Sequence, residues 1–322
     1  MRAVLQTAGE VVEVDASGSW ATEVVRDLPP RVPGPHDGPP TVRVRDGWAE
    51  QRLAHGRRIG RGVTAHDGAL ALTSACSSGV DLDVRATDDV VSVLADRRPT
   101  IREATLHRVL PERSRLLTAD VLLHYPAIWR SGWRGRAPLH AGALVVGGLG
   151  VLVVGASGVG KSTLAMAEVG SGATFVSDNV VVSDGRSAWG LLEPVRTAGG
   201  DGARTTHGRR LVEVPLRRLA TQVDLVVVLR REASAVQARE ISADVAAREL
   251  TAGTYSAGEL RRYWGFAATL AVGTGRGPAH PPVASVAQQV CSAAPCLELD
   301  LGDRPGAHLT HVVETLGVAQ WT

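Results

Sequence analysis

A glycine-rich segment, GASGVGKST, has the residue types and spacing to bind the phosphates of a nucleotide. It fits the pattern G-x-x-x-x-G-K-[ST], in which backbone amides surround phosphate oxygens, a lysine reaches the β- and γ-phosphates and the next hydroxyl joins a Mg²⁺ shell. Lys161 and Ser162 hold these last two positions. The alternative is a glycine-rich turn without a ligand. The predicted nucleotide-binding residues are Gly155, Ala156, Ser157, Gly158, Val159, Gly160, Lys161, Ser162 and Thr163.

The lysine of this segment is unusual in the whole chain. Of 35 lysine and arginine residues only one, Lys161, is a lysine, and Asn179 is likewise the only asparagine. Arginine therefore serves at every other cationic position. An ammonium group is compact, whereas a guanidinium group is broad and planar and does not fit into a narrow site. A lone lysine therefore indicates a place where the smaller cation is needed.

An aspartate and a histidine are predicted to lie beside this segment. Asp178 follows the lysine by about fifteen residues, room for one helix and one strand, so it emerges at a strand end near the phosphate loop. Its carboxylate could bind Mg²⁺ or accept a proton from an attacking hydroxyl; capping a turn toward Gly185 is the alternative. His140 opens the preceding strand and could orient or protonate Asp178, or it could be a structural histidine.

Further charged residues follow in the segment EPVR and in the basic, glycine-rich stretch after it. Such a loop, ordered on binding, could neutralise the charge of a transferring phosphoryl group, although charge runs are often only solvated faces. The predicted catalytic residues are Asp178, His140, Arg196 and Arg204. The predicted Mg²⁺ ligands are Ser162, Asp178 and Glu193.

The elements that would position these residues alternate between strand and helix. Two apolar strands, HAGALVV and GVLVVG, are predicted around a turn at 147–150, followed by a helix over 162–169 and a strand over 174–177. Strands over 223–230 and 296–301, with helices over 245–250 and 257–270, complete an α/β layer with a buried sheet.

The first part of the chain has a different pattern. Short β segments over 3–5, 11–14, 41–44, 69–74 and 80–84 predict a smaller, mostly β region, with a proline-rich loop over 29–40 and a short helix over 87–95. Helical periodicity begins at Glu112. The sequence therefore predicts an N-terminal region over 1–110 and a second domain over 111–322.

Composition excludes several other classes of protein. The 322 residues are 44% hydrophobic and 21% charged, with a net charge of +2 and a mean hydropathy of +0.03, which is typical of a globular chain. The balanced charge and the 4% of aromatic residues argue against nucleic acid as a partner. We expect neither a membrane span nor a secretory signal, and hence a cytoplasmic protein, and we expect the three cysteines to be structural. The sequence does not fix the oligomeric state, and a homo-oligomer is one of the alternatives that it leaves open.

Two common classes of P-loop protein are excluded by missing motifs. Guanine-specific GTPases need [NT]KxD, and the only lysine already lies in the phosphate loop. ABC ATPases need an LSGGQ-like segment, and none occurs in the chain.

The arrangement of the remaining motifs resembles HPr kinase/phosphorylase and its looser relatives. The resemblance covers about residues 135 to 230 and consists of LHAGALVV, GVLVVGASGVGKSTLA and FVSDN, where relatives usually read V-A-D-D. It implies a P-loop core like that of phosphoenolpyruvate carboxykinase. It also implies that Asp178 is the catalytic aspartate and His140 the active-site histidine, with Lys161 and Ser162 at the nucleotide and Mg²⁺ positions.

Three departures from the family pattern indicate an acceptor other than HPr. Asn179 replaces the second acid of the pair, Thr163 stands where the bifunctional enzymes carry glutamate, and EPVR only partly matches E-x-R-G. We therefore predict an ATP- and Mg²⁺-dependent kinase that phosphorylates a serine or threonine hydroxyl of a peptide or protein, such as a ribosomally made natural-product precursor. The alternatives are a kinase of a small alcohol such as free serine, and a regulatory module that binds ATP without using it.

Overall fold

The computed structural model describes residues 2–26, 28, 38–48, 55–197, 210–212, 214, 217–302 and 306–315. These residues form a mixed α/β structure that divides into two compact units. Unit 1 is built from the described residues within Met1–Trp133 and Arg262–His280, and unit 2 from those within Arg134–Ala203, Arg209–Arg261 and Pro281–Thr322. Residues 111–133, which the sequence assigns to the second domain, therefore pack in unit 1.

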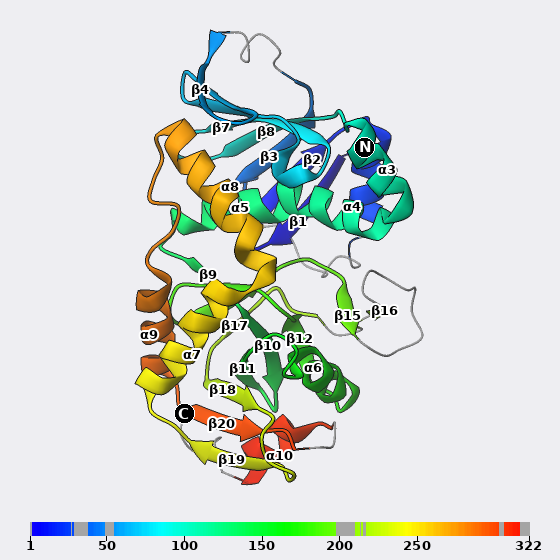
Figure 1. Ribbon diagram of the computed structural model, residues 1–322. Coiled ribbons are helices and arrows are strands. Elements are labelled where there is room, and N and C mark those ends of the chain that lie inside the picture. The colour runs from blue at the N-terminus through cyan, green and yellow to red at the C-terminus, as the bar shows by residue number, and fades with distance from the viewer. Residues whose placement is uncertain are drawn as a thin grey trace. The chain divides into compact units, whose positions relative to one another are not determined.

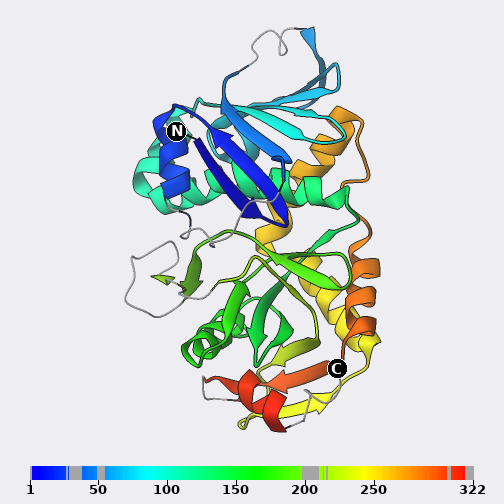
Figure 2. The ribbon, with the colours of Figure 1, turned by 180° about the vertical axis from the view of Figure 1, so that it is seen from behind.

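Unit 1 contains an eight-stranded sheet in the order β1-β2-β3-β8-β7-β6-β5-β4, with β1 and β2 in dark blue at one edge in Figure 2. The β2–β3 and β3–β8 pairs are parallel, and the others are antiparallel. The strands are β1 (Arg2–Thr7), β2 (Glu10–Asp15), β3 (Val42–Asp46), β4 (Arg57–Gly60), β5 (Val63–His66), β6 (Ala69–Leu72), β7 (Val80–Ala86) and β8 (Val91–Arg97).

Helices cover this sheet and complete the core of unit 1. They are α1 (Ser19–Arg26), the short η1 (Ala75–Ser77), α3 (Ile101–Val109), α4 (Pro111–Ala119), the π-helical turn η2 (Asp120–His124) and α5 (Tyr125–Gly132). The α5 helix packs against β2 and β3, and its Trp129 is fully buried. Helix α8 (Gly258–Thr274) contributes its residues from Arg262 onward to unit 1.

The predicted helix over 87–95 is wrong. The described chain makes a turn there, with the Thr87 amide donating to the Val90 carbonyl at 3.0 Å, and then forms β8. The residues of β8 alternate, so that Val91, Val93 and Ala95 are buried between β3 and β7. This period of two outweighs the helix-capping signal of the acidic residues at 88 and 89, because pairing on both sides buries one face of the strand. Residues 29–37 of the predicted proline-rich loop lie outside the described residues.

Unit 2 is centred on a six-stranded sheet in the order β12-β10-β11-β18-β20-β19. Its strands are β10 (Ala141–Val146), β11 (Leu149–Val154), β12 (Thr174–Ser177), β18 (Leu225–Arg230), β19 (Gln237–Glu240) and β20 (Cys296–Asp300). The predicted apolar hairpin is β10 and β11, which pair from Ala141 opposite Val154 to Val146 opposite Leu149. Because β10 is antiparallel to both β11 and β12, and β11, β18 and β20 are mutually parallel, four strands of the sheet run in one direction.

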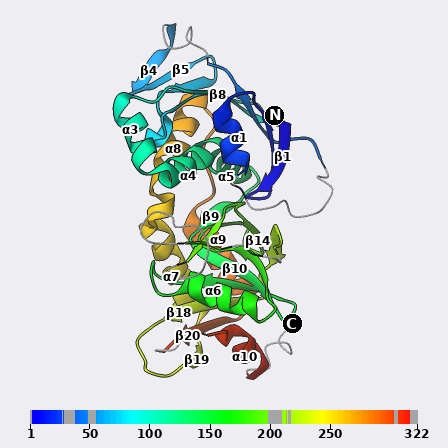
Figure 3. The same ribbon diagram turned by 90° about the vertical axis from the view of Figure 1, so that its right-hand side faces the viewer.

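Helices cover both faces of this sheet. On one face, α6 (Lys161–Gly170) and α10 (His308–Thr315) share an apolar core with alternate residues of the strands, such as Leu144, Val153 and Val227. On the other face, α7 (Ala243–Ser256) packs against β11, β18 and β20 and against α9 (Val283–Ala293). Figure 1 shows α6 on one side of the sheet and α7 with α9 on the other, and Figure 3 shows α6 in front of β10.

Two smaller sheets complete unit 2. The strands β9 (Ala137–Leu139), β13 (Val181–Ser183), β14 (Ser187–Gly190) and β17 (Ala220–Gln222) form an antiparallel sheet in the order β17-β14-β13-β9. The strands β15 (Val195–Thr197) and β16 (Arg210–Val212) form a separate pair. Among the described residues, no helix has the length and apolar character needed to cross a membrane.

Candidate functional site

One edge of the six-stranded sheet gathers the predicted site residues. The parallel strands β12 and β11 both end there, so Asp178 and Gly155, the residues that follow them, lie at the same edge. Between them, β10 begins at that edge directly after His140. The strand order therefore places the histidine between the aspartate and the start of the phosphate loop.

The chain changes sheets at this edge twice, in two places that face each other. It passes from β9 to β10 through His140, and from β12 to β13 through 178–180. Leu139 pairs with Val181 on one side and Ala143 with Ser177 on the other, a register that sets Gly142 opposite Asp178. A Cβ on Gly142 would lie 3.1 Å from the Asp178 carbonyl oxygen, so the absence of a side chain there allows the two segments to approach closely.

The phosphate loop runs from the end of β11 to the start of α6. Gly158 and Gly160 have φ angles of +85° and +121°, in the region that only glycine adopts without strain. Ala156, Ser157 and Gly158 are exposed, and the ten-residue helix α6 begins directly after Gly160. The loop therefore presents backbone to solvent at the amino end of a helix, where unpaired amides and the helix dipole favour an anion.

Lys161 is held in place by the loop that it follows. Lys161 is buried, with 5% of its surface exposed. Its Nζ donates to the carbonyl oxygens of Gly155 at 2.8 Å and Ala156 at 3.2 Å. An ammonium has three N–H donors, so one is left for a phosphate oxygen. Burial lowers the pKa of Lys161, and the carboxylates of Glu259 and Asp178 oppose this shift. The arrangement fits a phosphate group that would compensate the buried charge.

Asp178 is buried at 3% exposure in a tight turn. The Ser177 hydroxyl donates to the Val180 carbonyl at 2.6 Å and closes this turn. The Asn179 amide group donates to Asp178 Oδ2 at 3.3 Å. The only asparagine of the chain therefore acts here as a hydrogen-bond donor to the predicted catalytic carboxylate, which holds the orientation of that carboxylate.

His140 is buried at 2% exposure, and its backbone amide donates to Thr254 Oγ1 of α7 at 3.0 Å. Burial, together with the positive charge of Lys161, lowers the pKa of His140; Glu259 and a hydrogen bond with the Gly253 backbone oppose this shift. The imidazole is therefore neutral at neutral pH. A neutral imidazole has one N–H donor and one acceptor nitrogen, so His140 could orient Asp178 through a hydrogen bond. It lacks the second proton of an imidazolium, so the structure does not favour the predicted role of protonating Asp178.

Sequence reasoning missed Arg217. Its guanidinium carbon lies 4.8 Å from the centre of the Phe175 ring, and Nη2 donates to the Glu193 carbonyl at 2.9 Å. Burial lowers the pKa of Arg217, and the negative charges of Glu193 and Asp178 oppose this shift. Nothing in the local sequence distinguishes this arginine from the other arginines of the chain, because its place depends on a long-range contact between Phe175 and Arg217.

Glu259 was missed for the same reason. It is an exposed residue in the first turn of α8, yet its charge acts on both Lys161 and His140.

Of the other predicted residues, Glu193 is half-buried and lies in the segment between β14 and β15. Arg196 lies in β15, but its side chain is outside the described part of the structure, and Arg204 is wholly outside it. Their roles stay predictions.

The donors present fit Mg²⁺ bound largely by phosphates and water. Ser162 and Asp178 supply a hydroxyl and a carboxylate, which are hard oxygen ligands. Within the described ranges, no cluster of three or more histidine, cysteine, aspartate or glutamate residues could form a complete protein cage for a metal. Mg²⁺ is usually held by one or two carboxylates together with substrate phosphates, which is the kind of site that these residues could form.

Comparisons with known proteins add little to this geometry. No family model matches the chain, and no curated protein matches it. Among solved structures, the chain is similar to the Hpr(Ser) kinase/phosphatase from Coxiella burnetii, with 14% sequence identity and a TM-score of 0.30. The match covers 57% of this chain and 95% of that one. A likeness at this level supports no functional argument, so the proposals below depend on the residues of this chain.

Proposed function

We propose that this chain is an ATP- and Mg²⁺-dependent kinase with a P-loop core, which transfers the γ-phosphoryl group to an alcohol. The acceptor we propose is a serine or threonine hydroxyl of a peptide or protein. One observation carries the proposal above all others: a buried carboxylate, Asp178, lies at the same edge of the same sheet as a phosphate loop with a buried lysine.

The nucleotide end of the reaction is assigned to the phosphate loop. Backbone amides between Gly155 and Lys161 bind the phosphates. The remaining N–H of the Lys161 ammonium donates either to the oxygen that bridges the β- and γ-phosphorus atoms or to a non-bridging oxygen of these two phosphates. Ser162 and Asp178 would hold Mg²⁺, which when bound neutralises phosphate charge and orients the triphosphate. Because the loop is preformed and Lys161 is already desolvated, little reorganisation accompanies binding.

The acceptor end of the reaction is assigned to Asp178. Its carboxylate accepts the proton of the acceptor hydroxyl as the hydroxyl oxygen forms a bond to the γ-phosphorus and the bond from that phosphorus to the bridging oxygen of ADP breaks. The products are a phosphate ester, ADP and a protonated Asp178, which then releases its proton to water. Asn179 keeps Oδ2 in position, and the neutral His140 adds no competing positive charge beside the base.

The test is transfer of labelled phosphate from ATP with Mg²⁺ to serine-containing peptides and, in parallel, to small alcohols such as free serine. We expect the peptides to be labelled. Replacing Asp178 by Asn should lower the transfer rate by about 10²- to 10⁴-fold, because the base contributes to the chemical step. The loss of Mg·ATP affinity should be much smaller, because phosphates, water and Ser162 supply the other ligands of Mg²⁺.

Asp184 provides the matched control for this variant. It is an exposed aspartate in the turn between β13 and β14, where it accepts from the amides of Arg186 and Ser187 at 3.0 and 2.9 Å. Asp184→Asn should transfer phosphate at the wild-type rate. Full activity of the Asp178→Asn protein would contradict the assigned base. A wild-type protein without Mg²⁺-dependent affinity for ATP would contradict the kinase itself.

A further inference from the structure

Arg217 is a partly buried cation whose charge interacts with that of the proposed base, and three contacts hold its position. Its backbone bridges to Phe175, and the amide of Arg218 donates to the Phe175 carbonyl at 2.8 Å. Its side chain lies against the Phe175 ring and donates from Nη2 to Glu193. Since Phe175 belongs to β12, the strand that ends at Asp178, the guanidinium is tied to the segment that carries the base.

Most of the donors of this guanidinium are unused. Nε and Nη1 are both buried from solvent, and neither has a hydrogen-bond partner in the described part of the chain. A guanidinium has five N–H donors, of which Nε carries one and Nη1 two. Buried donors on a charged group destabilise a protein unless something binds them, so their presence indicates a missing anionic or strongly polar partner.

The chemistry of the surroundings limits what that partner can be. Stacking on Phe175 and the bond to Glu193 restrict the side chain, so the partner has to come to Arg217 rather than the reverse. The negative charges of Glu193 and Asp178 act on the guanidinium without occupying Nε and Nη1. A planar guanidinium binds oxyanions such as phosphate and carboxylate with several parallel hydrogen bonds.

We propose that Arg217 is a second phosphoryl-binding residue of the site, and that its Nε and Nη1 donors bind non-bridging oxygens of the phosphoryl group during transfer. This inference rests on the kinase function proposed above. Lys161 then holds the group from the nucleotide side and Arg217 from the side of Asp178. Charge that spreads over the non-bridging oxygens in the transition state is met by a desolvated cation that is already in place.

A transition-state analogue tests the inference without knowledge of the acceptor. Mg·ADP binding is measured by calorimetry, with and without aluminium fluoride, which occupies the place of the transferring phosphoryl group. We expect aluminium fluoride to tighten ADP binding to the wild-type protein by about 100-fold, as expected for a cation that acts on the transferring group. In Arg217→Ala most of the tightening should be lost, with a remainder from Lys161, while Mg·ADP affinity alone stays the same; added guanidinium ion should restore part of the loss.

Arg218 is the matched control, because it is the neighbouring arginine and its side chain is exposed. Arg218→Ala should keep the full effect of aluminium fluoride. If Arg217→Ala does not fold, Arg217→Lys decides the question, since it keeps the charge and the aliphatic stem but loses the planar donor set; it too should lose most of the tightening.

Each outcome separates this inference from the proposed function. If Arg217→Ala and Arg217→Lys respond to aluminium fluoride as the wild type does, the inference is wrong and the kinase proposal stands. The phosphate-transfer assay gives a second way to overturn the inference. If Arg217→Ala raises only the KM for the acceptor, Arg217 binds a carboxylate of the acceptor and not the transferring phosphoryl group. If the wild-type protein binds no Mg·ADP, the proposed function fails first.

Discussion

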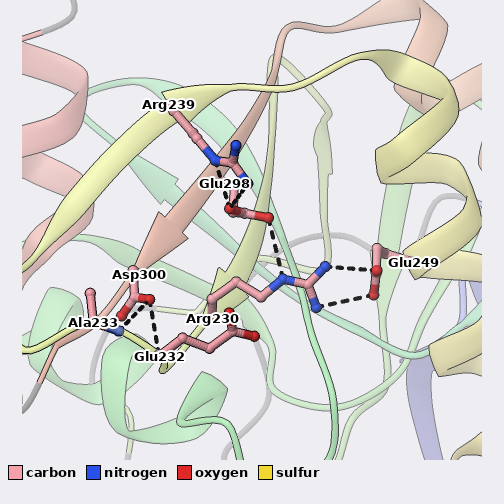
Figure 4. Close-up of polar contacts among 7 residues, drawn as sticks. All are labelled: Arg230, Glu232, Ala233, Arg239, Glu249, Glu298 and Asp300. Carbon is pink, nitrogen blue, oxygen red and sulfur yellow. Dashed lines mark hydrogen bonds and ion pairs between the residues drawn. The ribbon is translucent and has the colours of Figure 1, made fainter.

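Two groups of charged residues lie in the two halves of one edge of the six-stranded sheet in unit 2, and they differ in how far they are buried. At the ends of β12, β10 and β11, the side chains of Asp178, His140 and Lys161 are almost completely buried. At the ends of β18 and β20, the charges are more exposed and form a connected network (Figure 4). Arg230 binds Glu249 of α7 at 2.7 Å and Glu298 at 3.3 Å, and Arg239 binds Glu298 at 2.6 Å.

The pKa shifts follow this difference. Burial lowers the pKa values of Lys161, His140 and Arg217, so the folded state disfavours the charged form of each group. In the network, the hydrogen bond with Glu249 raises the pKa of Arg230. Burial tends to raise the pKa of Glu298, but hydrogen bonds from Arg239 and Arg230 outweigh it and lower the pKa overall. The network therefore favours its own charges, whereas burial in the other half disfavours them.

The same edge thus combines one half in which opposite charges compensate one another and one half in which buried charges are disfavoured. Asp300 adds to the first by accepting from the amides of Glu232 and Ala233, each at 2.9 Å, which holds the chain after β18 in place (Figure 4). Ionisable groups whose pKa values are shifted by burial together with specific charged neighbours are candidates for functional sites.

The largest expected effect separates the two halves directly. Lys161→Met removes the ammonium from the phosphate loop and should weaken Mg·ATP binding by about 100-fold, since a hydrogen bond to a charged group contributes about 1.5–3 kcal/mol. Arg239→Met, in the network, should leave the affinity unchanged. Calorimetric titration with Mg·ATP measures both. If Lys161→Met binds Mg·ATP with an affinity close to that of the wild type, the lysine of the loop does not bind the phosphates.

A second prediction concerns the hydrogen bond between Asn179 and Asp178. Asn179→Asp replaces a donor by a like charge, which should raise the pKa of Asp178 and move the acidic limb of the pH–rate profile upward by about one unit. Asn179→Ala removes the donor without adding charge and should move the limb less. The profile of kcat in the phosphate-transfer assay gives the result. An unchanged acidic limb in both variants would show that Asn179 does not act on the base.

The next prediction uses the buried histidine. The pKa of His140 in the folded protein is lower than in the unfolded chain, so below about pH 6.5 the unfolded chain takes up a proton that the folded ring does not. Stability present above that pH is therefore lost on acidification, by up to about 1.4 kcal/mol per pH unit from this group. His140→Gln should show a smaller loss between pH 7.5 and 5.5 in urea titrations.

Another histidine serves as the comparison for this measurement. His55 is exposed, so His55→Gln controls for the replacement of a histidine by glutamine at the surface. If His140→Gln loses stability on acidification as steeply as the His55→Gln protein does, burial of the imidazole has no energetic consequence, and the contrast between the two halves of the edge is weaker than we infer.

The smallest effect is expected in the ion-pair network. The Arg239 side chain is 73% exposed, so Arg239→Ala should lower the free energy of unfolding by only about 0.5 kcal/mol or less, and by less still in 1 M salt. Denaturant titration at low and high salt measures this. A loss of several kcal/mol would mean that the network is a main source of stability rather than a local support for β19 and β20.

Much of the candidate site could be predicted from short-range patterns. The phosphate loop is a contiguous motif, and the predicted strand over 174–177 and helix over 162–169 correspond closely to β12 and α6. The position of Asp178 at a strand end near the glycine-rich loop could be predicted, because the length of one helix and one strand sets it. By contrast, the segment over 87–95 was misread as a helix, since its acidic start resembles a cap and only pairing with β3 and β7 makes it β8.

The sequence by itself determined the positions of the glycine-rich motif, its lysine and the acid that follows, because a few adjacent residues dictate the local backbone; the roles of these residues stay predictions. Only the tertiary structure decided that β10 lies between β11 and β12, which brings His140 to the edge between Lys161 and Asp178. It also decided that Arg217, about forty residues after Asp178, stacks on Phe175. These contacts depend on which strands pair across long stretches of chain, and neighbouring residues do not encode that choice.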